Sequence, residues 1–361
     1  MVETLSDRPR KGRGAVSNAS GRFEPHARVM VDDGWALDDG DDGPAPLRTT
    51  VTTDASRTVI ARNTSPDVPF DRSINPYRGC EHGCIYCFAR PTHAFLGLSP
   101  GLDFETRLFA KPDAAKLLEA ELARPSYRPD SIGLGTNTDP YQPIERRYGI
   151  TRQVLEVLWR TRHPVMIVTK SNLILRDLDI LAPMAEAGLV GVMISVTTLR
   201  RDLARALEPR APRMDRRLEA IRGLARAGVA VGVLAAPMIP ALNDDELEAI
   251  LEAAAAAGAG AAGYTVLRLP LEIADLFAEW LDAHFPDRKA RVLNQIRDMR
   301  GGKLYDSAWG KRMKGGGPHA EVLNRRFKLA CTKLGLNRTR WDLDTSQFRR
   351  PRANTAQLDL F

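Results

Sequence analysis

The sequence predicts an α/β protein built around a partial (β/α)6 TIM-like barrel, with extensions at both ends. Between residues 73 and 286, short β-branched or apolar runs alternate with segments of helical periodicity. In runs such as 229–234 both the odd- and the even-numbered residues are apolar, as expected for parallel strands that are covered on both faces. The six strand–helix units are fewer than the eight of a closed barrel. A flat, doubly wound sheet is the alternative arrangement.

The elements of the core are expected in strict alternation. Strands are expected at 73–78, 131–135, 165–169, 190–196, 229–235 and 263–267. Helices are expected at 114–123, 151–161, 178–187, 214–227, 244–257 and 271–284. Asn243 is a plausible N-cap, because the acidic residues that follow it favour the positive end of a helix dipole. Gly188, Gly228 and Gly258 stand where left-handed helix terminators are expected.

Composition divides the 361 residues into four parts. Residues 1–45 combine a basic start with an acidic, glycine-rich patch, which predicts a disordered arm. Residues 46–286 form the barrel core, with one or two lead-in strands within 47–60. Residues 287–350 form a basic extension with a helix at 320–334, and residues 351–361 form a flexible tail.

The net charge of +7 is concentrated near the C-terminus. Residues 288–352 hold 18 Lys and Arg against five Asp and Glu, so the remaining chain is net acidic. The same segment carries aromatic residues, namely Tyr305, Trp309, Phe327, Trp341 and Phe348. A basic segment of this kind favours an anionic partner, and we expect nucleic acid. A solvated surface without a partner is the alternative.

Composition also argues against a secreted or membrane protein. No run of eighteen apolar residues occurs, and residues 1–14 are polar without the apolar segment of a secretory signal. Three of the four cysteines lie within eight residues, unlike a disulfide framework. We therefore expect a cytoplasmic protein with metal or redox chemistry at its clustered thiols.

Cys80, Cys84 and Cys87 form a C-x3-C-x2-C pattern directly after the first expected strand. In parallel α/β folds, sites are built at this end of the strands. Three thiolates leave one iron of a [4Fe–4S] cluster open to a substrate or cofactor. A zinc site completed by His82 or His93 is one alternative. A redox pair of Cys84 and Cys87 is another, although it leaves Cys80 unexplained.

With Tyr86 before the last cysteine, this pattern resembles the signature of the radical S-adenosylmethionine (SAM) superfamily. Within it, residues 70–270 resemble the spore photoproduct lyase-related group. The similar segments are Asn-Pro-Tyr-Arg-Gly at 75–79, Thr-Asn-Thr-Asp-Pro-Tyr-Gln-Pro-Ile-Glu at 136–145, Thr-Lys at 169–170, and Ser195. The resemblance implies a [4Fe–4S] cluster and SAM as cofactors. It also implies reductive cleavage of SAM to a 5′-deoxyadenosyl radical, which abstracts hydrogen from a substrate.

The resemblance further implies cofactor contacts at the ends of the strands. Tyr86 is expected to face the adenine ring, and Thr136 and Thr138 to meet the methionine amino group. Lys170 is expected to pair with the methionine carboxylate, and Ser195 to bond the ribose or the carboxylate. The alternatives are hydroxyls that satisfy loop backbone and a lysine at a solvent-exposed strand end.

Three acidic residues are candidates for the substrate side of the site. Asp139 and Glu145 are expected to line the substrate pocket, with a proline-braced turn as the alternative. Glu208 is expected to form a polar lip, with a surface turn as the alternative.

One departure from spore photoproduct lyase concerns its hydrogen donor, which is understood to be a cysteine near the end of strand two. Residues 133–137 read Gly-Leu-Gly-Thr-Asn and contain no cysteine, which argues against photoproduct repair itself. Cys331 is the one cysteine outside the motif. It is a candidate catalytic hydrogen donor or ligand, with a buried structural thiol as the alternative.

The last five residues, from Gln357 to Phe361, resemble the peptide by which bacterial repair proteins dock on the sliding clamp. We interpret the chain as a lyase-like radical SAM enzyme that acts on a DNA lesion or modified nucleotide. A radical SAM enzyme that modifies a protein or small molecule is one alternative, and a non-enzymatic zinc-binding DNA-interaction module is another. The sequence identifies no electron donor.

Overall fold

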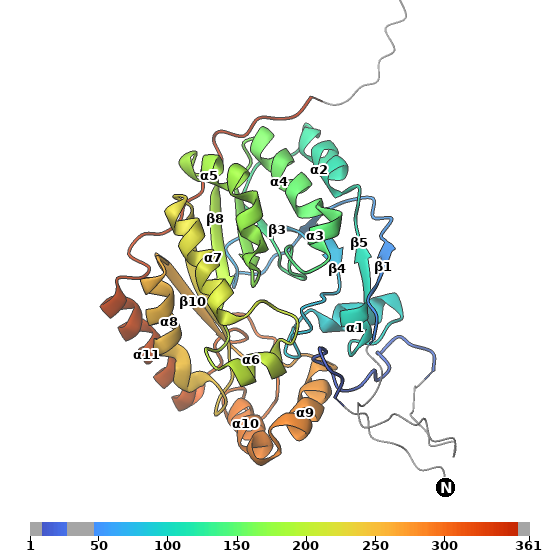
Figure 1. Cartoon of the computed structure of the whole chain (residues 1–361), viewed down its shortest axis with the longest axis vertical. Helices are drawn as coiled ribbons and strands as arrows, with labels where there is room; N and C mark the ends of the chain where they lie inside the picture. The colour runs from blue at the N-terminus through green and yellow to red at the C-terminus, as the bar shows by residue number, and fades with distance from the viewer. Residues whose placement is uncertain (1–8, 27–46, 353–361) are drawn as a thin grey trace, which may run out of the picture.

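A computed structural model of the chain describes residues 9–26 and 47–352. Its centre is a seven-stranded sheet with the order β10-β9-β8-β7-β6-β3-β2 (Figure 1). The parallel strands are β3 (Arg72–Ile74), β6 (Ile132–Leu134), β7 (Val165–Thr169), β8 (Val190–Ser195), β9 (Ala230–Met238) and β10 (Ala261–Val266). Their order in the sheet follows their order in the chain, whereas a doubly wound sheet reverses at a switch point. The predicted partial barrel is therefore confirmed.

The helices that cover the barrel agree with the predicted ones to within three residues at each end. They are α2 (Ala114–Ala123), α4 (Ile150–Arg160), α5 (Leu178–Glu186), α7 (Met214–Arg226), α8 (Leu247–Ala256) and α9 (Ile273–His284). The shorter helical elements are η1 (Arg90–Leu96), α1 (Asp103–Thr106), α3 (Glu145–Tyr148), η2 (Asn172–Asp177), α6 (Arg201–Leu207) and η3 (Asp244–Glu246). Gly188, Gly228 and Gly258 have φ angles of +69°, +75° and +104°, which confirms them as left-handed terminators.

Asn243 stands at the N-cap position of η3, but its side chain makes no capping hydrogen bond. Its side-chain amide donates to the carbonyls of Thr197 (2.7 Å) and Pro237 (3.0 Å) and accepts from the Ile239 amide (2.6 Å). Asn243 is fully buried and joins the loops that follow β8 and β9. Helix α8 begins later than expected because the turn η3 comes first.

The predicted strand at 73–78 is divided in two. Pro76, which has no amide hydrogen to donate to a sheet, separates β3 from β4 (Tyr77–Arg78). β4 joins a second, smaller sheet in the order β1-β5-β4, with β1 (Thr50–Thr53) and β5 (Arg107–Ala110). The short strand β2 (Ile60–Arg62) pairs antiparallel with β3 and forms one edge of the large sheet.

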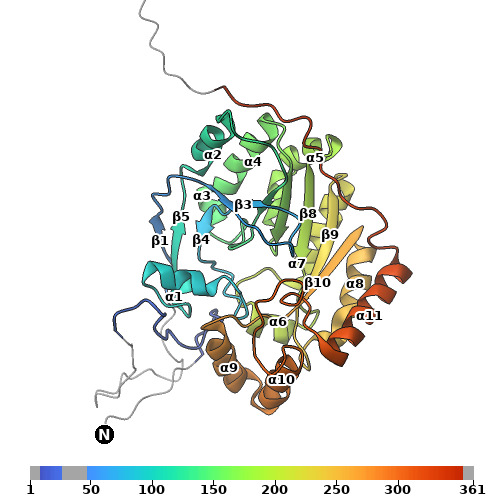
Figure 2. The same cartoon turned by 180° about the vertical axis from the view of Figure 1, so that it is seen from behind.

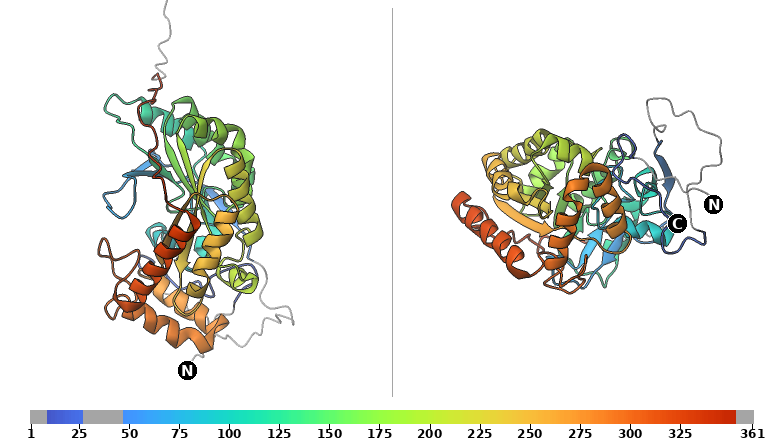
Figure 3. Two further views of the ribbon diagram at one scale, coloured as in Figure 1. Left: turned by 90° about the vertical axis from the view of Figure 1, so that its left-hand side faces the viewer. Right: turned by 90° about the horizontal axis from the view of Figure 1, so that it is seen from below.

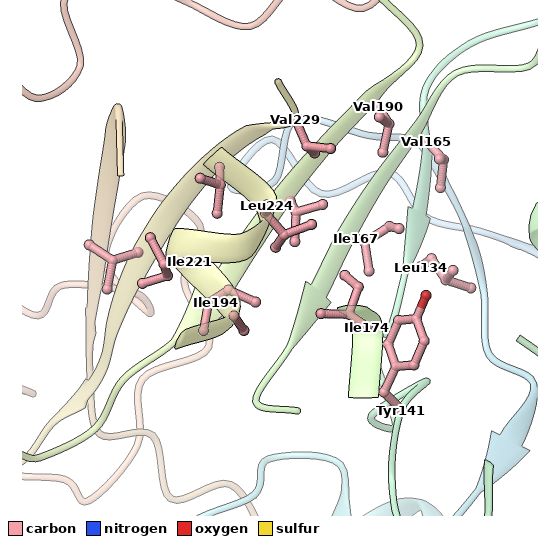
Figure 4. Packing of buried hydrophobic residues seen from close by; sticks show 14 of the residues in the cluster. Leu134, Tyr141, Val165, Ile167, Ile174, Val190, Ile194, Ile221, Leu224 and Val229 are labelled. Atoms are coloured by element: carbon pink, nitrogen blue, oxygen red, sulfur yellow. The ribbon is translucent and has the colours of Figure 1, made fainter. Parts of the chain in front are cut away.

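The hydrophobic core lies between the large sheet and its helices (Figure 4). Ile167 and Ile194 of the strands are fully buried, as are Ile221 and Leu224 of α7. Each such side chain contributes about 1.5–3 kcal/mol relative to exposure to water. The alternate residues of these strands, such as Val168 of β7 and Leu234 of β9, are half-buried, so the second face of the sheet is less completely covered than the sequence predicts.

The part of the N-terminal arm that the structure describes is packed rather than disordered. Ala15 and Val16 are 1% and 5% exposed, and the backbone amides of Gly14 and Ala15 bond to the carboxylate of Glu105. The expectation of disorder over residues 1–45 is therefore wrong for residues 9–26.

The basic extension folds onto the barrel (Figures 2 and 3). Helices α10 (Pro286–Asp298) and α11 (Gly317–Leu334) pack against α9 and α8, respectively. The Val266 amide of β10 donates to the Met313 carbonyl (2.8 Å), and the Asn337 side chain forms two hydrogen bonds with the Ala262 backbone. The clamp-like peptide at 357–361 lies outside the described residues. No helix in the described part of the chain is both long and apolar enough to span a membrane.

Candidate functional site

The three clustered cysteines lie on a loop between β4 and η1. Cys80 and Cys84 are each 7% exposed, and Cys87 is half-buried. The loop is anchored through its backbone, since the Cys80 amide donates to the Phe104 carbonyl at 3.0 Å. Gly83 has a φ of +70°, and a Cβ at this position would lie 2.7 Å from the Glu105 carboxylate. Glycine at this position therefore allows the loop to approach Glu105 closely.

A buried arginine holds the shape of this loop. Arg90 is fully buried, and its guanidinium donates to the carbonyls of Cys84 (2.9 Å) and Gly83 (3.2 Å). It also pairs with Glu105 at 2.5 Å, and both side chains of this ion pair are 0% exposed. Because Glu105 in turn bonds to the amides of the N-terminal arm, one carboxylate connects the arm, the arginine and the cysteine loop.

The thiols interact electrostatically with one another. Burial raises the pKa of Cys80, and the nearby Asp139, Cys84 and Cys87 raise it further. Burial raises the pKa of Cys84 to about 12, although the Lys170 ammonium opposes this effect. Soft thiols that lie near enough to raise one another's pKa fit an iron–sulfur cluster, whose positive charge would bind them as thiolates.

The histidines proposed for a zinc site have other partners. His93 Nε2 lies 3.0 Å from the Arg107 carbonyl, its ring packs edge-on against Phe104, and burial lowers its pKa to about 4. His82 Nδ1 lies 3.4 Å from an Asp139 oxygen. Within residues 9–26 and 47–352, no three His, Cys, Asp or Glu side chains converge where they could share one metal ion. A [4Fe–4S] cluster requires no such convergence, because each thiolate binds a different iron.

The loop that follows β6 supports the cysteine loop. Thr138 Oγ1 donates to the Gly79 carbonyl at 2.7 Å, so this hydroxyl satisfies loop backbone. The fully buried Gln142 donates to the same carbonyl (3.2 Å) and accepts from the Glu81 amide (2.9 Å). Thr136 is half-buried and accepts from the Asn75 side chain at 3.2 Å.

The two acidic residues of this loop are buried in the structure. Asp139 accepts from the Thr169 hydroxyl (2.6 Å) and the Lys170 amide (2.8 Å), which ties the ends of β6 and β7 together. Burial would raise the pKa of Asp139, but His82 and these hydrogen bonds lower it to about 2. Glu145 is fully buried and accepts from Tyr77 Oη at 2.5 Å. The expected role of Asp139 and Glu145 as pocket lining is thus replaced by hydrogen bonds within the fold.

A buried polar cluster surrounds Tyr86 and Glu208 at the ends of β7 and β8. Tyr86 donates its hydroxyl to Glu208, which also accepts from Thr197 (2.6 Å) and from Arg217. Glu208 and Arg217 are 3% and 1% exposed, so the alternative of a surface turn at Glu208 is wrong. Burial alone would raise the pKa of Glu208, but Arg217 and Lys170 lower it to about 2.

Lys170 connects this polar cluster with the cysteine loop. Its Nζ lies 5.7 Å from the centroid of the Tyr86 ring. Burial lowers its pKa, but the Cys84 and Glu208 charges outweigh that effect, and the pKa is raised. Lys170 therefore carries its positive charge beside the cysteine loop, where it can pair with a carboxylate.

The two remaining candidates lie in different places. Ser195 ends β8 beside the same cluster, is 5% exposed, and its carbonyl accepts from Arg217 at 3.1 Å. Cys331 is buried in α11, on the part of the molecule where this helix packs on α8, and its sulfur lies 3.7 Å from the Asn337 amide nitrogen. The structure does not bring Cys331 to the cysteine loop.

A cavity of about 560 Å³ opens between α6 and α7. Glu208 and Arg217 of the buried polar cluster form part of its lining, and Pro209, also in the lining, lies beside Gly83 of the cysteine loop. The residues that sequence reasoning missed are the buried charges and amides around the loop: Arg90, Glu105, Gln142, Thr197 and Arg217. These polar and charged residue types are usually found at exposed positions, and no local sequence pattern indicates that they are buried.

Comparisons with known proteins agree with this geometry. The Radical SAM superfamily profile matches residues 74–254. An uncharacterized protein of Mycobacterium tuberculosis is 40% identical over 234 residues, which cover 64% of this chain and 68% of the relative. An uncharacterized protein of Methanocaldococcus jannaschii is 27% identical over 173 residues, which cover 48% of this chain and 62% of the relative.

Solved structures of spore photoproduct lyase share the fold. One complexed with dinucleoside spore photoproduct is 17% identical, with a TM-score of 0.58 over 79% of this chain and 80% of that chain. A mutant of the same enzyme with bound AdoMet and dinucleoside spore photoproduct is 15% identical, with a TM-score of 0.57 and the same coverage. Taken with the loop that carries Cys80, Cys84 and Cys87, the profile match shows that this chain belongs to the radical SAM superfamily, whose cofactors are a [4Fe–4S] cluster and SAM.

Proposed function

We propose that this radical SAM enzyme abstracts hydrogen from a nucleotide of DNA. The proposal rests on the contacts between the basic extension and the cysteine loop. Phe88 directly follows Cys87 and is 44% exposed, and the Arg268 guanidinium lies 4.9 Å from its ring centroid. The same guanidinium lies 5.9 Å from the ring of Tyr305 in the basic extension. The surface next to the thiols is thus aromatic and cationic, which suits a base and its phosphates.

The residues of the site have separate roles in this proposal. Cys80, Cys84 and Cys87 would hold the cluster through their thiolates, and an iron without a cysteine ligand would remain for SAM. When bound, the cluster and SAM supply one-electron reduction and a carbon radical. Lys170 offers an ammonium to the methionine carboxylate, and Tyr86, whose hydroxyl is fixed by Glu208, offers a ring face of fixed orientation to the adenine.

Two further parts of the proposal concern partners. The basic segment 288–352 would contact DNA, and the peptide from Gln357 to Phe361, outside the described residues, would dock on a sliding clamp. Both would bring the site to DNA without adding to its chemistry. The hydrogen donor that completes the reaction is not Cys331 in this proposal, because that thiol is buried in α11.

The test begins with protein purified without oxygen and reconstituted with iron and sulfide. After reduction and addition of SAM, we expect a brown protein that releases 5′-deoxyadenosine, measured by chromatography. Cys84→Ala should abolish both colour and product, whereas the matched Cys331→Ala should retain both. A colourless wild-type protein that holds one zinc would overturn the enzymatic proposal. DNA should bind with strong salt dependence, and absent or salt-independent binding would refute the DNA substrate.

A further inference from the structure

The segment at residues 300–316, called the strap below, crosses the open side of the partial barrel. At one end Arg300 donates to the Leu267 carbonyl just after β10 (3.0 Å). At the other end Asp67, in the loop between β2 and β3, accepts from the Gly310 amide (2.7 Å) and pairs with Arg312 (2.5 Å). Because β10 and β2 are the two edges of the sheet, the strap connects them from outside. Figure 3 (left) shows the strap and the β2–β3 loop projecting from the same side.

The strap has a fixed backbone rather than a loose one. Arg300 is 3% exposed, and its guanidinium donates to the carbonyls of Lys311 (3.1 Å) and Arg312 (2.8 Å). The Met313 carbonyl accepts from the Val266 amide at the end of β10. A loop fixed in this way presents its outward side chains in constant positions, which lowers the entropy cost of binding.

The outward side chains of the strap are aromatic and cationic. Trp309 is 59% exposed, so its ring does not stabilise a core. Lys303, Lys311 and Lys314 are exposed. Residues 300–316 hold five basic residues and one acidic residue, Asp306, whose carboxylate accepts from the Ala308 amide within the strap. An exposed ring flanked by cations is the arrangement that binds single-stranded nucleic acid by stacking and phosphate contact.

Side-chain contacts connect the strap with the cysteine loop. Tyr305 of the strap lies within 3.5 Å of Arg268, measured between its hydroxyl and Nη2, and Arg268 lies over the ring of Phe88. This row of side chains leads from Tyr305 to the residue that follows Cys87, and Trp309 lies four residues further along the strap. An extended strand on the strap would therefore pass beside the site of radical formation.

We infer that the strap is the binding surface for single-stranded DNA, with an unpaired base stacked on Trp309 and phosphates on Lys311 and Lys314. Paired bases hide their faces in the duplex, so stacking on a protruding ring requires an unpaired base. The net positive charge of the strap is complementary to phosphate. The inference rests on the proposed DNA-directed function and names the element that carries it.

The test measures binding of a fluorescein-labelled oligo-dT by the full-length, cluster-loaded chain, using fluorescence anisotropy at several salt concentrations. Trp309→Ala should weaken binding about 5- to 150-fold, the range for loss of one stacked base, and Trp309→Phe should restore most of it. The double variant Lys311→Ala/Lys314→Ala should lower the slope of log affinity against log salt by about 1.4. Trp309→Ala should leave that slope unchanged, because the indole carries no charge.

Matched controls lie on other surfaces. Phe95 is 70% exposed on η1, and Lys11 and Lys116 are exposed and lie outside the basic segment 288–352. Phe95→Ala removes an exposed aromatic ring and Lys11→Ala/Lys116→Ala removes two exposed ammonium groups, and both variants should bind as the wild type does. Far-ultraviolet circular dichroism and the absorbance of the cluster verify that each variant is folded and loaded.

The outcomes separate the two proposals. If the wild type binds no DNA, both the DNA-directed function and the role of the strap are overturned. If the wild type binds and the strap variants bind equally well, only the role of the strap is overturned. Binding of duplex DNA or of oligo-U as tight as that of oligo-dT would overturn the assignment to single-stranded DNA.

Discussion

Replacing Glu208 by glutamine tests whether the buried polar cluster beside Lys170 depends on one carboxylate. Glutamine keeps the size of the side chain but removes its charge. Arg217, which is 1% exposed, would then be a buried cation without its partner. Breaking a buried ion pair by removing one partner costs about 3–5 kcal/mol.

The pKa of Glu208 gives a second measure of this cost. It is lowered from 4.5 to about 2 in the folded chain, which corresponds to about 3 kcal/mol. Because the folded pKa lies below the unfolded one, the stabilisation is complete above pH 4.5 and is lost as the pH falls through about 2. The difference in free energy of unfolding between wild type and Glu208→Gln should thus be largest at neutral pH and small near pH 2.

Urea unfolding followed by circular dichroism, on matched oxygen-free preparations, measures that difference. Glu219→Gln is the control, since Glu219 pairs with Arg216 at the surface with side chains 46% and 57% exposed. An exposed pair is worth about 0–1 kcal/mol. The assignment of a buried ion pair is refuted if both variants lose the same small free energy of unfolding at pH 7. It is also refuted if the loss caused by Glu208→Gln is unchanged at low pH.

Three further substitutions test the site and its supports. Lys170→Met should weaken SAM binding by the reconstituted protein about 10- to 150-fold in calorimetry, and unchanged affinity would exclude the carboxylate contact. Gly14→Ala places a Cβ 1.8 Å from the Gly83 carbonyl and should speed proteolysis within residues 9–26, unlike Gly260→Ala, which meets no atom within 4 Å. Gln142→Leu removes the side-chain bonds to the backbone on either side of Cys80 and should lower iron per chain without unfolding the protein. Full iron content in that variant would contradict the supporting role.

Local patterns predicted the barrel well because its strands and helices are locally regular. The strand expected at 190–196 is observed as Val190–Ser195, and the helix expected at 214–227 as Met214–Arg226. The expectations that depended on distant partners were wrong. The arm at 9–26 is ordered by Glu105, about ninety residues along the chain, and composition contains no sign of that contact.

The site was predictable only where its chemistry requires a fixed spacing. The cysteine pattern is local, so Cys80, Cys84 and Cys87 could be identified from the sequence. The ion pair of Arg90 and Glu105 could not, because charged residues are usually exposed and nothing local marks this pair as buried.

The contacts of the basic extension with β10 also protect the protein against aggregation. A partial barrel, unlike a closed one, leaves the backbone of its last strand free to pair with another chain. Asn337 and Met313 occupy backbone groups of β10 at Ala262 and Val266, so this edge is already covered. Removing residues 288–361 would expose the edge to intermolecular pairing and aggregation. A truncated chain could therefore lose DNA binding because the edge of its barrel is damaged or because the positive charge is missing. Point variants of the strap separate these two causes.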